Sequence, residues 1–345
     1  MNVSLEKNIR EVINQIDFSG VVYIEENGEG IFENAWNFAN RSDQIENKVH
    51  TRFGIASGCK LFTAVAVSQL VEKGIISFDT SLVDFLDIPF KHISPEVTVH
   101  HLLTHTSGIP DYFDEELMDD FEELWVRNPM YHIRKLEDFL PLFQDQPMKN
   151  KVGDSFSYNN AGFILLGLIV EKASGLPFSD YVQKNIFDKA NMTDSGYFSF
   201  DSLPTNTATG YIENSDGTWR TNIYSLPVKG GADGGAFVTA YDMSKFWRAL
   251  IGYQLLNESN TKQLLTPHIQ VNETGFYGYG IWIKKDIENI IKYHVMGYDP
   301  GVSLHSAHYP DLSINVVICS NKSDGAFDIM KVIEEEVTNK MAVKK

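Results

Sequence analysis

Ser57 and Lys60 lie three residues apart in this 345-residue chain, at the start of an apolar stretch with helical spacing. Side chains three residues apart share one face of a helix, so the lysine amine can reach the serine hydroxyl. A serine hydroxyl is a weak nucleophile until a base removes its proton, and a lysine can be that base when its amine is neutral. Free N–H groups at the helix start would also favour negative charge near Ser57. The pair therefore predicts a serine that can be acylated without a histidine.

The same spacing also has a simpler structural interpretation. A second pair with this spacing, Ser4 and Lys7, indicates that chance supplies the pattern in a chain of this length. Residues 61–71 are mainly apolar at helical spacing, which is typical of a buried helix. Ser57 would then only cap that helix, and the charged end of Lys60 would extend outward to water. Taken alone, the segment leaves both interpretations open.

A tyrosine and an asparagine, Tyr158 and Asn160, lie just before a second apolar helix expected at 161–174. A phenol near a positive lysine can act as a general base when it is ionised, and it can return the proton to a leaving group. An asparagine amide both donates and accepts hydrogen bonds, which suits the orientation of a lysine and a substrate carbonyl. The alternatives are a half-buried aromatic side chain for Tyr158 and a helix cap for Asn160. Each residue taken singly favours these alternatives.

Composition and charge limit the class of protein. An apolar fraction of 43% predicts a globular chain, and the net charge of −17 argues against a nucleic acid as partner. No apolar run approaches the ~18 residues of a membrane span, and the first twenty residues lack the apolar core of a signal peptide. We therefore expect a cytoplasmic protein as written, or an extracytoplasmic one if a leader was removed. Cys59 and Cys319 are expected to be buried free thiols, no cofactor is expected, and the oligomeric state is not predicted.

The predicted elements divide the chain into two lobes. An amphipathic helix is expected at 5–16 and a strand–turn–strand unit at 20–38. Further strands rich in β-branched and aromatic residues are expected at 279–283, 290–295, 302–307 and 313–319. A last helix is expected at 325–339. The fold class predicted is α/β (α+β), with an antiparallel sheet of five or more strands flanked by the N- and C-terminal helices. We expect residues 1–55 and 271–345 to form this sheet lobe, residues 56–270 to form a mainly helical lobe, and the active site to lie between them.

With these motifs in place, the chain resembles a known group, the serine β-lactamase and penicillin-binding-protein superfamily, on its class C β-lactamase side. The resemblance rests on the Ser57 and Tyr158 motifs and on three further stretches in the same order, 97–110, 162–167 and 234–243. It implies a β-lactamase/transpeptidase-like fold and a serine hydrolase that acts through an acyl-enzyme on D-amino-acid peptides, β-lactams or related amides. The alternatives are a β-lactamase-like carboxylesterase and a non-catalytic scaffold that binds peptides or peptidoglycan.

The resemblance also implies a role for each residue of the site. Ser57 would attack the substrate carbonyl with the assistance of Lys60 and Tyr158. Asn160 would orient Lys60 and the substrate. The backbone N–H groups of Ser57 and Tyr298 would hold the oxyanion, after which water would release the acyl group.

The third motif departs from the pattern of the superfamily. Relatives carry Lys-Thr-Gly or His-x-Gly on the strand that borders the site, where this chain has residues 293–301. If Gly297 matches the glycine of the motif, Val295 stands where the lysine or histidine is expected, and His294 comes one residue early. An offset of one residue on a strand turns a side chain to the opposite face. Either a bulge returns His294 to the cleft as a substrate-binding residue beside Gly297, or the site lacks the cation that meets a substrate carboxylate.

Other candidate sites have weaker support. His101 and His105 could share a helix face, but no His-Glu-x-x-His is present, and a metal site is not expected. The glycine-dense segment 229–235 lacks the spacing of a phosphate loop and predicts a turn beside the cleft. In the acidic segment 111–123, Tyr112 is a candidate to line the mouth of the cleft and contact substrate. No Gly-x-Ser-x-Gly is present, which argues against an α/β-hydrolase.

Overall fold

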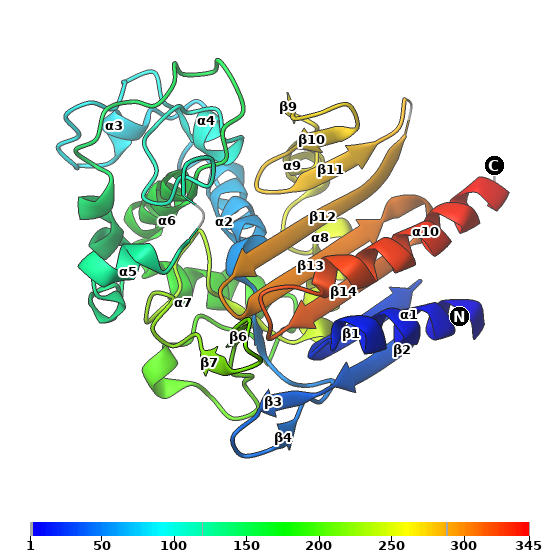
Figure 1. The fold of residues 1–345 in the computed structure, drawn as a ribbon. Coiled ribbons are helices and arrows are strands. Elements are labelled where there is room, and N and C mark those ends of the chain that lie inside the picture. Colours follow the sequence, from blue (N-terminus) through cyan, green and yellow to red (C-terminus); the bar gives the residue numbers. More distant parts are fainter. Residues whose placement is uncertain (1–2, 119, 288, 345) are drawn as a thin grey trace.

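An eight-stranded antiparallel sheet runs through the centre of the protein (Figure 1). The computed structural model describes residues 3–118, 120–287 and 289–344. In space the strands follow the order β2-β1-β14-β13-β12-β11-β10-β9. They are β1 (Gly20–Glu26), β2 (Glu29–Trp36), β9 (Ile269–Gln270), β10 (Gly275–Tyr277), β11 (Trp282–Lys285), β12 (Ile290–Asp299), β13 (Val302–Tyr309) and β14 (Ile314–Ser320). The predicted antiparallel sheet is confirmed, and the short strands β9 and β10 extend one edge of it beyond the segments expected from the sequence.

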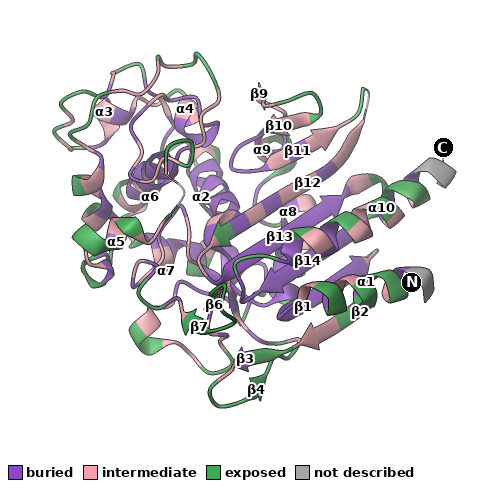
Figure 2. Ribbon diagram, viewed as in Figure 1, coloured by how far each residue is buried: buried purple, intermediate pink, exposed green. Residues whose placement is uncertain are grey.

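The first and last helices of the chain cover one face of this sheet. They are α1 (Val3–Ile16) and α10 (Ala326–Lys344), and they lie side by side across β1, β13 and β14 (Figure 1). Ile9 of α1 and Ile329 of α10 are fully buried in a cluster with Val316 of β14. The sides of α1 and α10 that face away from the sheet carry exposed residues, as Figure 2 shows. The predicted flanking by the terminal helices is confirmed.

A second and larger core fills the space between the opposite face of the sheet and the helical part of the protein. Helix α8 (Ala240–Ile251) packs against β1 and β14 on that face. The indole of Trp247 donates a hydrogen bond of 2.8 Å to the hydroxyl of Ser306 on β13. Because both side chains are buried, this bond satisfies two polar groups that would otherwise be costly to bury, and it fixes the helix on the sheet.

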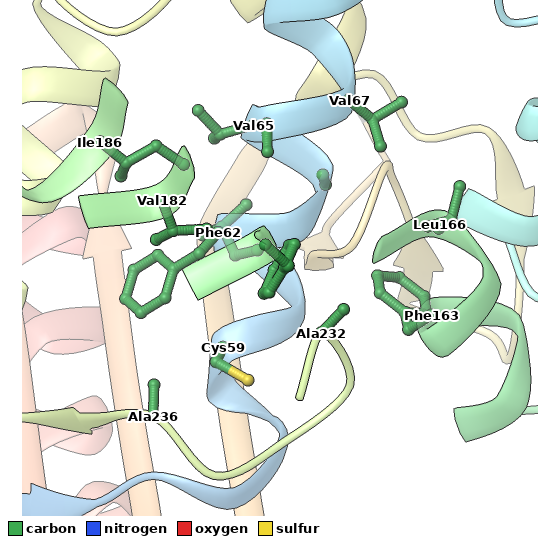
Figure 3. Close-up of a cluster of buried hydrophobic side chains, with 14 of the residues drawn as sticks. Cys59, Phe62, Val65, Val67, Phe163, Leu166, Val182, Ile186, Ala232 and Ala236 are labelled. Carbon is green, nitrogen blue, oxygen red and sulfur yellow. The ribbon is translucent and has the colours of Figure 1, made fainter. Parts of the chain in front are cut away.

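Helix α2 (Lys60–Glu72) is the centre of this larger core. It is surrounded by α6 (Asn160–Ser174), α7 (Phe178–Val182) and the π-helical turn η4 (Gln183–Phe187). Figure 3 shows Phe163 of α6 on one side of α2, and Phe62 together with Ile186 of η4 on the other. Since α2 is buried on all sides, the residues at its start are held in place by packing from several elements.

Shorter elements complete the fold around these cores. The remaining helices are α3 (Leu82–Phe85), α4 (Val99–Leu103), α5 (Glu123–Arg127), α9 (Glu258–Leu264), and the 3-10 turns η1 (Ala56–Cys59), η2 (Met130–His132), η3 (Leu136–Leu142), η5 (Phe200–Ser202) and η6 (Pro310–Leu312). The remaining strands pair two by two: β3 (Phe38–Asn40) with β4 (Ile45–Glu46), β5 (Phe53–Gly54) with β8 (Phe237–Val238), and β6 (Tyr211–Glu213) with β7 (Trp219–Thr221). The lobe boundaries at residues 55 and 270 stay predictions.

Among the described residues, no single helix has the length and apolar composition needed to cross a membrane. One bent pair of helices, Asn160–Ser174 with Phe178–Phe187, meets that test when the two are taken together. The residues of α6 from Asn160 to Val170 are buried, so the apolar character of the pair is accounted for by its place in the core.

Candidate active site

Ser57 lies in η1, the short 3-10 turn that joins the sheet to α2. Helix α2 begins at Lys60, and its N-cap position is held by Cys59, whose side chain makes no capping hydrogen bond. The expectation that Ser57 sits at the head of the helix, or caps it, therefore differs from the structure by one turn. Ala56 has a left-handed φ of 47°, which is unusual for a residue with a Cβ and is typical of tight functional turns. The Ala56 carbonyl accepts a hydrogen bond of 3.1 Å from Gly235, which holds the turn against the 229–235 loop.

Lys60 is only 1% exposed, so its amine does not extend to water. The alternative in which Ser57 only caps a helix required a Lys60 that reaches the solvent. Its Nζ donates hydrogen bonds to Oδ1 of Asn160 at 2.7 Å and to the backbone carbonyl of Asp233 at 2.8 Å. The third neighbour of Nζ is the hydroxyl oxygen of Ser57, at 3.0 Å. Carbonyl oxygens can only accept. A neutral Lys60 therefore places both of its N–H groups on Asn160 and Asp233 and turns its lone pair toward the hydroxyl of Ser57.

Asn160 is the first residue of α6, and Asn159, not Asn160, caps that helix. The Asn159 side chain accepts the N–H of Gly162 at 2.7 Å. The carboxylate of Asp111 accepts the N–H groups of Asn160 and Ala161, at 2.7 and 2.9 Å. Burial raises the pKa of Asp111 to about 7, against the lowering effect of these two bonds. With the helix end satisfied by its neighbours, the amide of Asn160 is free to face Lys60.

Tyr158 packs over Lys60. The Nζ of Lys60 lies 4.8 Å from the centre of the Tyr158 ring. That ring lies tilted against His105, with ring centres 4.4 Å apart, and stacks on Trp282, with ring centres 6.4 Å apart. Burial, reinforced by the negative charge of Glu115, raises the pKa of the Tyr158 phenol well above its usual value, although a hydrogen bond to Ser57 opposes this. The phenol therefore holds its proton in the resting state. The expectation of an ionised tyrosine base does not match this environment, and the proton of Tyr158 is available for donation.

His105 supports Tyr158 and is not arranged as a metal ligand. Its Nδ1 accepts the N–H of Asn159 at 3.0 Å, so in the neutral ring Nε2 carries the proton and donates to the hydroxyl of Tyr277 at 3.1 Å. Burial lowers the pKa of His105 well below its usual value. His101 instead contacts Thr98 at the start of α4. Among the described residues, no group of three or more His, Cys, Asp or Glu side chains could hold a metal ion.

The glycine of the third motif brings β12 against the turn that carries the serine. A methyl group placed on Gly297 would lie 2.1 Å from the carbonyl oxygen of Ile55 and 2.9 Å from the backbone nitrogen of Ser57. Gly297 and Tyr298 both line the same pocket as Ser57. The two backbone N–H groups expected to hold an oxyanion are thus brought to one pocket by a contact that only a glycine permits.

The pairing of β12 decides which side of the sheet His294 occupies. From Tyr293 to Asp299, β12 pairs with β13 without a shift in register, so the bulge that would return His294 to the cleft is not formed there. His294 lies opposite Ala307, whose side chain belongs to the cluster under α1 and α10. Burial and the positive charge of Lys292 lower the pKa of His294 well below its usual value. His294 is therefore neutral and is not among the described residues that line the pocket.

Val295 occupies the motif position on the face toward the helical part. It is 2% exposed and belongs to the larger core. A valine cannot donate a hydrogen bond or carry charge. The alternative in which the third motif supplies no cation thus fits the geometry, because Val295 and Gly297 share one face of β12 and His294 lies on the other.

The pocket above Ser57 has a volume of about 660 Å³. Tyr112 forms part of its wall: it is largely buried, and its hydroxyl donates a short hydrogen bond to the carboxylate of Asp233. The expectation that Tyr112 lies at the mouth of the cleft is thus modified, since the tyrosine contacts the loop that also binds Lys60. That loop, the glycine-dense segment 229–235, lines the pocket as predicted and was not expected to contact the lysine.

Reasoning from the sequence missed several pocket residues, among them the acidic residues Asp233 and Asp299. Both line the pocket. Asp233 lies in the glycine-dense loop, where the only signal was the loop itself. Asp299 follows Tyr298 directly, and its position beside the expected oxyanion donor was a usable signal, because residues 297 and 299 of a strand point to the same face.

The arrangement can perform acyl transfer. A nucleophilic hydroxyl lies beside an enclosed amine, the amine is oriented by two carbonyl acceptors, and backbone N–H groups converge on the same pocket. The sequence pattern of the family described as Beta-lactamase matches residues 5–333. The chain belongs to the beta-lactamase family. As a member of that family it has the β-lactamase/transpeptidase-like fold and is a serine hydrolase of the type that acts through an acyl-enzyme.

Other members of the beta-lactamase family match over most of the chain. A penicillin-binding protein from Bacillus halodurans, solved as a crystal structure, is 57% identical, with 95% of this chain and 99% of that chain covered and a TM-score of 0.92. Penicillin-binding protein 4* of Bacillus subtilis (strain 168) is 27% identical over 326 residues, which are 89% of this chain and 69% of the relative. Teichoic acid D-alanine hydrolase of Staphylococcus aureus (strain MRSA252) is 22% identical, over 82% of this chain and 67% of the relative.

Proposed function

We propose that the protein hydrolyses amides or esters of D-amino acids, through an acyl-enzyme formed on Ser57. The observation that carries the proposal is the enclosure of Lys60, whose amine is bound by Asn160 and Asp233 and directed at the Ser57 hydroxyl. The substrate class is supported by the names of two relatives, a penicillin-binding protein and a teichoic acid D-alanine hydrolase.

Acylation begins when neutral Lys60 takes the proton of Ser57 while Oγ attacks the substrate carbonyl. The oxyanion formed in this step accepts hydrogen bonds from the backbone N–H groups of Ser57 and Tyr298. The leaving amine or alkoxide needs a proton, and Tyr158 supplies it and recovers it from Lys60. Asn160 holds Lys60 in one orientation throughout.

Deacylation reverses the same proton path with water as the nucleophile. Lys60, neutral again once Tyr158 has regained its proton, removes a proton directly from the water that attacks the acyl carbonyl, and returns that proton to the Ser57 oxygen as the ester bond breaks. The tetrahedral intermediate uses the same two N–H donors. Ser57 is then released as a hydroxyl, so each group returns to its starting protonation state.

The third motif makes substrates with a free carboxylate a poor match for this site. Where the motif cation is absent, an anionic substrate loses a charge-assisted contact, which typically changes affinity ten- to a hundredfold. Slow turnover of β-lactams therefore accompanies the proposal, with uncharged amides and esters as better substrates. This also keeps a carboxylesterase as the second candidate function, favoured by Val295 in the motif position.

Covalent labelling tests the proposal against the non-catalytic scaffold. The protein would be incubated with an uncharged fluorophosphonate and with a β-lactam, and the modified residue would be located by mass spectrometry. The expected result is a single adduct on Ser57 and none in Ser57→Ala. Hydrolysis of D-alanyl p-nitroanilide and of p-nitrophenyl acetate then separates amidase from esterase. An unlabelled Ser57 in folded protein would exclude the acyl-enzyme.

A further inference from the structure

The charged side chains that line the pocket are all of one sign. Among the described lining residues they are the carboxylates Glu115, Asp120, Asp233 and Asp299. Lys60 lies behind the wall, with its amine engaged by Asn160, Asp233 and Ser57. The pocket is identified as a substrate site by the nucleophile, and its acidic lining is a separate property that bears on which substrate enters.

These carboxylates differ in how far the protein satisfies them. The Asp233 carboxylate accepts the hydroxyl of Tyr112, and Asp120 accepts the backbone N–H of Glu122 at 2.8 Å. Glu115 faces the side-chain amide of Asn160 at 3.5 Å, at the limit of a hydrogen bond. Within the described part of the chain, no group donates a hydrogen bond to the Asp299 side chain. Asp299 is therefore the carboxylate with the most unused capacity to accept.

The strand geometry aims Asp299 at the reacting end of the pocket. Successive side chains of a strand alternate between faces, so Asp299 shares the face of Gly297, which abuts the backbone nitrogen of Ser57. Tyr298, between them, turns its hydroxyl to the opposite face, where it contacts Nε2 of His305. The backbone N–H assigned to the oxyanion belongs to Tyr298, so the Asp299 carboxyl is adjacent to the place of the substrate carbonyl.

The electrostatics of the pocket also indicate which charge on a substrate it favours. Burial raises the pKa of Asp299 to about 8, and the negative charges of Asp233 and Glu115 add to this effect, while Lys60 opposes it. Burial likewise raises the pKa of Asp233. Gathered carboxylates are costly to ionise without a counter-charge. A cation in the pocket would remove that cost, whereas an anion would add to it.

We propose that the pocket selects acyl donors that carry a free ammonium group next to the scissile carbonyl, and that Asp299 receives this group. The proposal rests on the proposed function and names its substrate class: α-aminoacyl amides or esters with an unblocked amino group. An α-ammonium is one carbon from the carbonyl, which matches the adjacency of Asp299 to Tyr298. Asp299 is thus a specificity-determining residue. It favours a positively charged substrate group, whereas the cation of the usual third motif favours a negatively charged one.

A matched pair of substrates tests this directly. D-alanyl p-nitroanilide carries the ammonium, and isobutyryl p-nitroanilide has a methyl group in its place with the same acyl skeleton. Because the α-amino pKa is about 7.7–8.0, assays at pH 7.0 keep most of it charged. We expect the wild-type protein to prefer the D-alanyl substrate at least tenfold in kcat/KM, and N-acetylation of that substrate to remove the preference.

Variants assign the preference to one residue. In Asp299→Asn the ratio of the two kcat/KM values should fall about tenfold or more, because an amide cannot ionise when the ammonium binds, as the Asp299 carboxyl can. Glu116→Gln makes the same change of charge in the Glu115 loop but outside the described pocket lining, and it should leave the ratio as it is. If both variants lower the ratio equally, the effect is a general field and the assignment to Asp299 is overturned.

Covalent labelling distinguishes a missing ammonium preference from a missing nucleophile. Labelling of Ser57 by an uncharged fluorophosphonate reports the nucleophile whatever the substrate preference. If turnover of both anilides is too slow to measure, protection from labelling by D-alaninamide and by isobutyramide gives the same comparison by binding. Labelling at Ser57 with equal kcat/KM or equal protection for the two compounds overturns the inference alone. Absence of labelling overturns the proposed function and the inference with it.

Discussion

Gly297 and Ser57 are in backbone contact: a methyl group on Gly297 would lie 2.9 Å from the backbone nitrogen of Ser57. The contact joins the central strand β12 to the turn η1, two elements separated by more than two hundred residues in the chain. It sets how far apart the two expected oxyanion donors are. The spacing of these donors is therefore a property of the whole fold.

Gly297→Ala should disable the enzyme without unfolding it. The added methyl group would meet the carbonyl of Ile55 at 2.1 Å, and both partners are backbone, so η1 must move away from β12. Misplacing one oxyanion donor costs about 10²–10³ in kcat, and forced repacking costs about 1–3 kcal/mol of stability. Ester turnover and thermal unfolding measure the two effects. Full activity in Gly297→Ala would show that β12 does not set the oxyanion geometry.

Ser57→Ala should remove turnover while the fold persists. The Ser57 hydroxyl contributes little to packing, since η1 is held by backbone bonds such as that from Gly235 to Ala56. Loss of a nucleophile usually lowers kcat by at least ~10⁴-fold. Hydrolysis of a chromogenic ester and the thermal midpoint give the comparison. Retained turnover in folded Ser57→Ala protein would exclude Ser57 as the nucleophile.

Lys60→Ala and Asn160→Ala should each lose orders of magnitude in rate, and the double variant should be little worse than the poorer single one. The two side chains share a 2.7 Å hydrogen bond, so removing either leaves the other without its function. Tyr158→Phe should behave in the same way with respect to Lys60. The measurement is a double-mutant cycle on kcat/KM. Strictly additive losses would mean that these residues act independently.

Asp299→Asn should stabilise the protein increasingly as the pH rises from 3.8 to about 8, and not in acid below that window. Asp299 has a native pKa of about 8 against an ordinary 3.8, so between these values the native state binds more protons than the unfolded state. Stability contributed by this group therefore falls as pH rises through that window. The asparagine variant does not pay this cost, and a gain of about 1 kcal/mol would raise the midpoint by roughly 2–4 °C.

Thermal scans of wild type and Asp299→Asn at pH 4, 6 and 9 measure this difference. The gap between the two midpoints should be small at pH 4 and largest at pH 9. Asp233, Glu115 and Lys60 face the same carboxyl and contribute to the gap: Asp233 and Glu115 raise the pKa of Asp299, and Lys60 lowers it. A variant less stable than wild type at pH 9 would contradict the assignment of a raised pKa.

His294→Ala should not change the preference between a substrate with a free carboxylate and its methyl ester. His294 is neutral and lies on the α10 side of β12, so it offers no charge to the pocket. We expect the ester to be preferred in both proteins at pH 6 and pH 8. A preference for the free acid that appears below pH 6.5 in wild type and vanishes in His294→Ala would restore the histidine to the site.

The sheet could be predicted from the sequence, and so could the candidate site residues Ser57, Lys60, Tyr158 and Asn160. The strands expected at 290–295, 302–307 and 313–319 correspond to β12, β13 and β14, because their runs of β-branched residues and bounding turns are local signals. The gathering of Ser57 with Tyr158 came from the resemblance, since no local signal brings together residues a hundred positions apart.

The electrostatics of the pocket could not be predicted in the same way. An ionised Tyr158 was a reasonable expectation beside a lysine, but the depth of burial decides the pKa, and burial depends on contacts from distant segments. The contact of the Asp233 carbonyl with Lys60 could not be predicted either, because 173 positions of sequence separate the two residues. The orientation of His294 required the register of β12 on β13, which one bulge would have reversed.

The pairing of β1 with β14 has a consequence for how the protein is made. Gly20 pairs with Ser320, so β1 leaves the ribosome well before β14, and the two strands can pair only after the roughly 300 residues between them have been synthesised. Until then one long edge of the β1–β2 hairpin stays open, and open strand edges recruit other chains. At ≈ 5–20 residues per second this exposure lasts tens of seconds. Yield during expression should therefore respond to translation speed and to chaperones that shield strand edges.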